Sequence, residues 1–156
     1  MYDVLSVADA ILRIAKLRGK QLTPMQLVKL TYIAHGWSLA IRNVDLFKNR
    51  IEAWKYGPVI PDLYQATKQY GRNPIPLDLI GGDADFPVNA DDKRFLEEIF
   101  DAYGHLDGIK LSYLTHQAGT PWTEAYVPGL NAEISDASIT EHYRGLLSER
   151  SRVRAT

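Results

Sequence analysis

The sequence predicts a mainly α fold, a single compact helical domain of about six helices with a small two-stranded β-hairpin. The chain has 156 residues, the size of one domain, and its hydrophobic fraction of 46% and charged fraction of 24% are typical of a folded globular protein. Apolar residues recur at three- and four-residue spacing along most of the chain, which indicates amphipathic helices. That spacing is lost in the forties and fifties, where short apolar runs favour strands.

The first two expected helices cover residues 3–18 and 24–41. The second begins with a capping box, in which Thr23 is the N-cap and Gln26 completes the reciprocal hydrogen bonds. Gly36 interrupts its apolar stripe at a cost of about 1 kcal/mol relative to alanine. We therefore expect another backbone to approach the second helix closely at this glycine.

The expected hairpin covers residues 46–54. Two short apolar runs, residues 46–47 and 51–54, flank the polar residues 48–50, and Gly57-Pro58 is expected to break the pattern. A two-stranded hairpin is marginally stable alone, so it must pack against the helices.

The second half of the chain continues as helices separated by breaks. The remaining expected helices have apolar faces and cover residues 61–70, 89–103, 110–117 and 136–148. Residues 72–88 contain prolines and glycines at high density and predict a long irregular connection. The domain is expected to span residues 1–148, followed by a basic, frayed tail at residues 149–156.

Composition excludes several classes of protein. The chain has no cysteine, which removes disulfides, thiolate metal sites and cysteine nucleophiles. The most apolar charge-free run, residues 30–41, is too short to span a membrane, and Asp3 lies where a secretory signal needs positive charge. We expect a cytoplasmic protein with no membrane partner.

The charges are distributed unevenly along the chain. Residues 1–72 hold 11 Lys/Arg against 5 Asp/Glu, whereas residues 73–156 hold 7 against 14. This pattern fits either a solvated acidic face or a surface that attracts a basic partner. The sequence pI of about 6.4 argues against nucleic acid as the partner.

Catalytic signatures are missing from the sequence. It has no Gly-rich phosphate loop and no nucleophile elbow, and its four histidines show no metal-ligand spacing. We therefore expect no metal, no cofactor and no enzymatic activity. His116 lies just before a helix break, and a structural role is favoured for it over catalysis.

The segment of residues 52–64 is the most informative part of the chain. Trp54, Tyr56 and Tyr64 surround Gly57-Pro58, so large aromatic side chains accompany a restricted backbone. Two interpretations stay open. One is a rigid corner in which Trp54 is a mostly buried core anchor, and the other is a binding surface, because Tyr and Trp are enriched in interface hot spots.

Residues 22–40, LTPMQLVKLTYIAHGWSLA, and residues 51–71, IEAWKYGPVIPDLYQATKQYG, resemble the Panacea-domain antitoxins, also described as SocA-like or GepA-like phage-associated proteins. The resemblance covers about residues 3–147. The motif residues that carry it, besides Trp54, Gly57 and Pro58, are Lys29, Leu30, Tyr32, Trp37, Ala53, Val59, Thr115, His116, Pro121 and Trp122.

This resemblance implies a helical protein that neutralises a cognate toxin encoded by the adjacent gene, as in type II-like toxin–antitoxin systems. One alternative is a protease adaptor that delivers the toxin to an ATP-dependent protease. Another, from a different class, is a small hydrolase using His116 with a carboxylate such as Asp62 or Asp107.

The expected partner-binding surface combines aromatic anchors with acidic residues that attract a basic toxin. Its residues are Trp54, Tyr56, Gly57, Pro58, Tyr64, Asp83, Asp85, Asp91 and Asp92.

Overall fold

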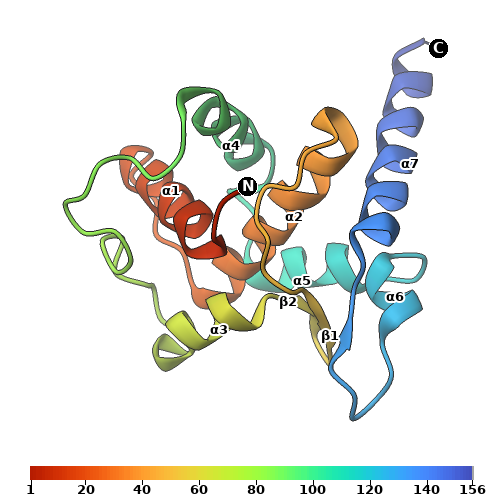
Figure 1. The fold of residues 1–156 in the computed structure, drawn as a ribbon, viewed down its shortest axis with the longest axis horizontal. Helices are drawn as coiled ribbons and strands as arrows, with labels where there is room; N and C mark the ends of the chain where they lie inside the picture. The colour runs from red at the N-terminus through yellow and green to blue at the C-terminus, as the bar shows by residue number, and fades with distance from the viewer. Residues whose placement is uncertain (156) are drawn as a thin grey trace.

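The computed structural model describes residues 1–155, and the side chains of residues 1–151. It confirms the mainly helical class and contains seven α-helices, one 3₁₀ turn and a three-stranded antiparallel sheet (Figure 1). The elements in chain order are α1 (Val4–Leu17), α2 (Pro24–Arg42), β1 (Glu52–Trp54), β2 (Gly57–Val59), α3 (Pro61–Thr67), η1 (Lys68–Tyr70), α4 (Ala90–Tyr103), α5 (Gly108–His116), α6 (Pro121–Ala125), β3 (Ala132–Glu133) and α7 (Asp136–Ala155).

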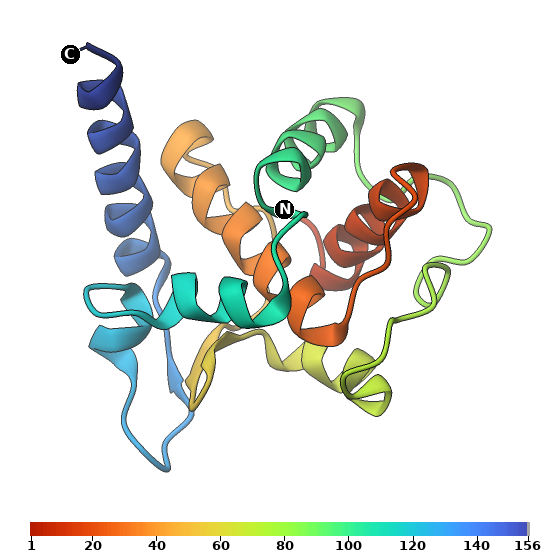
Figure 2. The same ribbon diagram turned by 180° about the vertical axis from the view of Figure 1, so that it is seen from behind.

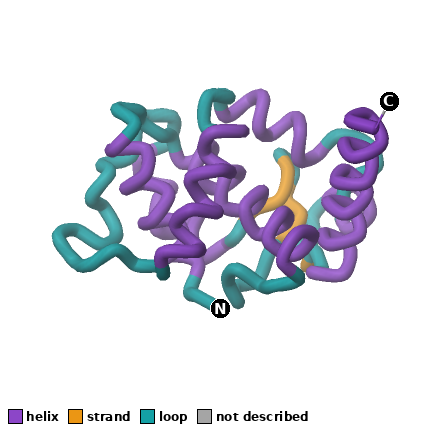
Figure 3. Tube along the Cα trace, turned by 90° about the horizontal axis from the view of Figure 1, so that it is seen from above, coloured by secondary structure: helices purple, strands orange, loops and turns teal. Residues whose placement is uncertain are grey.

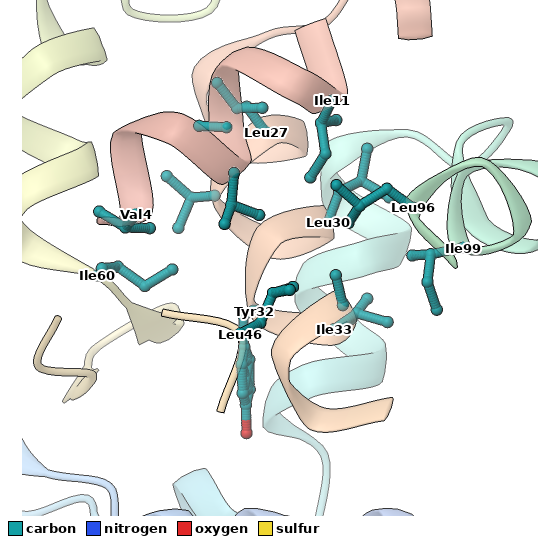
Figure 4. Packing of buried hydrophobic residues seen from close by; sticks show 14 of the residues in the cluster. Val4, Ile11, Leu27, Leu30, Tyr32, Ile33, Leu46, Ile60, Leu96 and Ile99 are labelled. Carbon is teal, nitrogen blue, oxygen red and sulfur yellow. The ribbon is translucent and has the colours of Figure 1, made fainter. Parts of the chain in front are cut away.

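Helix α2 is the centre of the fold. It begins with the predicted capping box, in which the Thr23 N–H donates to Gln26 Oε1 at 2.9 Å and the Gln26 N–H donates to Thr23 Oγ1 at 3.3 Å. Helices α1, α4, α5 and α7 all pack against it, so it is buried on every side along most of its length (Figures 1 and 2). Side chains of α1, α2 and α4 form much of the apolar core, and residues from the loops, such as Leu46 and Ile60, complete it (Figure 4).

Helix α7 crosses α2 at Gly36. The Tyr143 ring lies directly on this glycine, so a β-carbon at position 36 would overlap the ring. Sequence reasoning expected a backbone to approach here, and the structure shows that an aromatic side chain does. Trp37, the next residue, packs edge-on against the same ring with 5.1 Å between centroids.

The predicted hairpin, residues 46–54, is correct for one strand only: the run 51–54 contains β1, but its partner is β2 and not residues 46–47. The strands are β1 and β2, with Trp54 opposite Gly57 and Glu52 opposite Val59, so the chain turns at residues 55 and 56. Pro58 fits because β2 is an edge strand, where a missing N–H is tolerated. On the other edge of β1 lies β3, a strand of two residues that the sequence did not predict. Figure 3 shows the strands in orange among the helices.

Three further segments position these elements. Residues 71–89 contain no helix or strand, in agreement with the predicted irregular connection, and pass along α1 (Figure 1). A short helix, α6, begins at the proline where a break was predicted. Helix α7 continues past its predicted end at Ser148 and runs to Ala155, with Arg150 stacked 4.7 Å from the Trp37 ring centre. Among the described residues, no helix is long and apolar enough to cross a membrane.

Candidate functional site

Three side chains from three different helices hold the hairpin through its backbone carbonyls. Lys29 Nζ of α2 donates to Pro58 O at 2.8 Å, and Ser112 Oγ of α5 donates to Tyr56 O at 2.7 Å. The indole N–H of Trp122 in α6 donates to Trp54 O. We call this set, Lys29, Ser112 and Trp122, the hairpin clamp. Because it fixes alternate carbonyls across the turn, the hairpin is held rigidly against the helices.

Gly57 is the point at which the clamp closes on the hairpin. Its φ of +118° lies in the region that L side chains rarely adopt. A β-carbon there would lie 2.8 Å from Lys29 Nζ and 3.5 Å from Thr115 Oγ1. Glycine is therefore required both by the backbone conformation and by the closeness of α2 and α5.

Burial of Lys29 predicts a pH dependence of stability. The side chain is 2% exposed, and this desolvation lowers the pKa of Lys29 from 10.5 to about 7. A lysine in the unfolded chain keeps its proton to about pH 10. Between roughly pH 7 and 10 the unfolded chain therefore binds more protons than the folded protein does. The free energy of unfolding should rise with pH in this window, by up to about 1.4 kcal/mol per pH unit from this group.

Denaturant titrations of the wild type and of Lys29→Met at pH 7 and pH 9 measure this contribution. Methionine keeps an apolar stem but has no group that titrates. We expect a steeper rise of stability with pH in the wild type than in the variant. Equal pH slopes would show that Lys29 titrates normally in the folded protein.

A groove of about 470 Å³ lies beside the hairpin, between α2 and the α3–η1 segment. Trp54, Tyr56 and Tyr64 line it, and the rings of Trp54 and Tyr64 meet edge to face with 4.9 Å between centroids. The other lining residues are Pro24, Met25, Val28, Lys29, Lys55, Val59, Lys68 and Gly71. The lining is thus apolar with three lysines, and none of these lining residues is acidic.

The aromatic residues of the groove differ in exposure. Tyr56 is 64% exposed, whereas Trp54 and Tyr64 are half-buried. Trp54 donates its indole N–H to Glu52 Oε1 at 2.9 Å and is not the mostly buried core anchor that the sequence suggested. Gly57 and Pro58 are buried, so they shape the groove instead of lining it.

The four predicted acidic residues lie away from the groove. Asp83 and Asp85 are exposed in the connection before α4, and Asp91 and Asp92 lie in the first turn of α4. In Figures 1 and 2 these segments are separated from the hairpin by α1 and α2. Asp92 is also engaged internally, since it accepts from Arg42 at 2.7 Å. The structure does not bring the acidic and aromatic sets onto one surface.

Most remaining motif residues support the clamp or the core. Leu30, Tyr32 and Trp37 are buried in α2, and Ala53 is buried in β1. On the α5–α6 side, Thr115 donates to Leu111 O and Pro121 begins α6. Val59, in β2, lines the groove.

His116 has no carboxylate partner within hydrogen-bond distance among the described side chains. Its Nδ1 contacts the Ser112 carbonyl of its own helix, and its ring packs against Trp122 with 5.3 Å between centroids. Asp107 caps the opposite end of α5, about 13 Å away along a helix with a rise of about 1.5 Å per residue. Asp62 accepts instead from Asn49 at 2.7 Å. His116 therefore stabilises the α5–α6 corner.

Sequence reasoning missed Ser112 as a member of the clamp. Its role depends on a contact with Tyr56, which lies 56 residues earlier in the chain. A serine inside a helix gives no local signal of such a contact, because its hydroxyl commonly bonds to solvent or to the backbone of its own helix.

The fold and the groove define a small helical protein that presents a rigid hairpin beside an aromatic surface. The profile of the SocA-like antitoxins, Panacea domain, matches residues 27–123, a range that contains the hairpin and the complete clamp. The chain is also 28% identical over 155 residues to a protein named Antitoxin SocA from Caulobacter vibrioides (strain NA1000 / CB15N), with 91% of this chain and 82% of that protein covered. The chain belongs to the SocA-like, Panacea-domain antitoxin family. No solved structure matches it significantly.

Proposed function

We propose that this protein neutralises a cognate toxin by direct contact, and that the toxin docks in the groove beside the hairpin. One observation supports this location: Tyr56 is 64% exposed at the rim of the apolar groove, on a hairpin that the clamp holds in place. A large aromatic residue that is ordered before binding loses little entropy in a complex. It is therefore suited to anchor a partner.

The lining of the groove indicates the chemistry of its occupant. Lys55 and Lys68 contribute positive charge, and the remaining lining is mainly apolar and aromatic. A toxin segment that fits this groove carries apolar side chains together with an aspartate or glutamate. Lys29 of α2 also borders the groove, but it is buried and its lowered pKa reduces the positive charge that it contributes.

The acidic residues support a second role at a different surface. Asp83 and Asp85 are exposed, and neither forms an ion pair with the described side chains. Toxins that act on RNA need basic surfaces, and a distant acidic patch accelerates the encounter with such a partner. We propose that these residues affect the association rate, whereas the groove sets the dissociation rate.

Coexpression with the product of the adjacent gene tests the proposal. The wild type should restore growth to cells that express this toxin, and the double variant Tyr56→Ala/Tyr64→Ala should not. The matched control is Tyr113→Ala, which removes a 55% exposed tyrosine of α5 outside the groove and should protect like the wild type. If Tyr56→Ala/Tyr64→Ala protected the cells at the same protein level as the wild type, the groove would be excluded as the toxin-binding site.

The same experiment separates direct neutralisation from delivery to a protease and from catalysis. If the protein were only a protease adaptor, toxin abundance would fall in the presence of the ATP-dependent protease and recover without it. Direct neutralisation predicts that toxin abundance is maintained while growth is restored. A folded His116→Ala variant should still protect, since we propose no catalytic step at this residue.

A further inference from the structure

A second cluster of polar side chains lies outside the groove, where three distant segments meet. His35 of α2, Asp45 of the following loop and Asp136 at the start of α7 direct one nitrogen and two carboxylate oxygens at one another. His35 Nε2 lies 2.9 Å from Asp136 Oδ1 and 3.8 Å from Asp45 Oδ1. All three atoms lie within 4.8 Å of one another.

We propose that His35, Asp45 and Asp136 form a site for a divalent transition-metal ion, with Zn²⁺ as the ion that fits best. The donor set of one imidazole nitrogen and two carboxylate oxygens is one that zinc accepts. In a tetrahedral site with bonds of about 2.0–2.1 Å, ligand atoms lie roughly 3.3 Å apart. The distances of 2.9 and 3.8 Å lie on either side of this value, so binding needs only small side-chain movements.

Two features of the cluster are poorly explained by an ordinary ion pair. The side chain of His35 is 2% exposed, yet it faces two carboxylates. Among the described side chains, no lysine or arginine forms an ion pair with either carboxylate. In addition, Asp45 Oδ1 is inaccessible to solvent and receives no hydrogen bond from the residues that the structure describes. A buried acceptor without a donor costs free energy, and a bound cation would supply the missing partner.

The surroundings of the cluster suit an ion that keeps an open coordination position. The Phe47 ring packs on the His35 ring with 4.3 Å between centroids and fixes its orientation. Asp45 and Asp136 also line a cavity of about 280 Å³, whose other lining residues include Asn49 and Ser135. The cavity gives the ion a route of entry and room for a water ligand.

The ion would join the beginning of α7 to α2 and to the loop after it. Within the described part of the chain, His35 Nδ1 has no hydrogen-bond partner, so it lacks the outer acceptor that usually strengthens a histidine ligand by roughly 10- to 100-fold. We therefore expect a dissociation constant on the order of micromolar, weaker than in closed structural zinc sites.

Calorimetric titration of Zn²⁺ into the full chain, with no affinity tag, tests the site, and Co²⁺ absorption reports its geometry. We expect one ion per chain and visible bands typical of tetrahedral cobalt. Asp45→Asn keeps the shape of the side chain and the His35–Asp136 contact, and should weaken binding at least tenfold. The control Asp78→Asn, at an exposed carboxylate elsewhere, should bind like the wild type.

Circular dichroism confirms that each variant is folded before it is titrated. No saturable binding to the wild type would overturn the proposal and leave a shared proton between the carboxylates as the explanation. Equal affinity of Asp45→Asn and the wild type would also overturn it, because the ion would then bind elsewhere. Either result leaves the antitoxin proposal untouched.

Discussion

Replacing Gly57 by alanine is expected to lower the free energy of unfolding by about 2–4 kcal/mol. Two effects add. The φ of +118° imposes backbone strain of roughly 1–3 kcal/mol on a residue with a β-carbon. The new β-carbon, 2.8 Å from Lys29 Nζ, also displaces the amine from Pro58 O, and a hydrogen bond contributes about 1 kcal/mol.

Gly119→Ala is the matched control for this prediction. Gly119 also has a positive φ, of +83°, but a β-carbon there meets no atom within 4 Å. Gly119→Ala should therefore lower the free energy of unfolding through backbone strain alone, by about 1–2 kcal/mol. Urea unfolding of both variants measures the difference, and equal losses would show that the clamp does not require a glycine at position 57.

Gly36→Ala is expected to lower stability by about 2 kcal/mol, although alanine is the better helix former by about 1 kcal/mol. The added methyl group overlaps the Tyr143 ring, so α7 must move away from α2. Gly145→Ala is the control, because this glycine lies within α7 and no described residue comes within 4 Å of the added methyl group. It should stabilise the protein by up to about 1 kcal/mol.

A double-mutant cycle assigns the Gly36 effect to its contact. In a Tyr143→Leu background the smaller side chain leaves room for the methyl group, so Gly36→Ala should cost less than in the wild type. Thermal unfolding of the four proteins gives the coupling. If the cost were the same in both backgrounds, the ring would not be what constrains position 36.

Local signals predicted the helices well because the responsible interactions are short in sequence. The capping box at Thr23 and the N-cap at Asn89 join residues three positions apart, and both occur in the structure. The strand that pairs with β1 was misplaced because both strands have three residues each, too few for a period-two pattern. In addition, Gly57-Pro58 has the composition that usually ends a strand. Pro58 can nevertheless belong to β2, because the N–H that proline lacks is not needed at the edge of a sheet.

The site was predictable only in part. The motif and its resemblance to a family identified two of the three clamp residues and the aromatic residues of the groove, but not what they contact. Lys29 reaches Pro58 across 29 positions and Trp122 reaches Trp54 across 68, and no periodicity encodes such pairs. For the same reason, the sequence could not show that the acidic residues and the aromatic groove lie apart, or that His35 meets Asp136.

The central claim is that the groove beside the hairpin binds the toxin directly. The most direct test is calorimetric titration of the purified product of the adjacent gene, in a form made inactive, into this protein. We predict a saturable complex with the wild type and with Tyr113→Ala, and at least tenfold weaker binding by Tyr56→Ala/Tyr64→Ala. No complex with the wild type would contradict direct neutralisation, and full affinity of the folded groove variant would contradict the groove as its site.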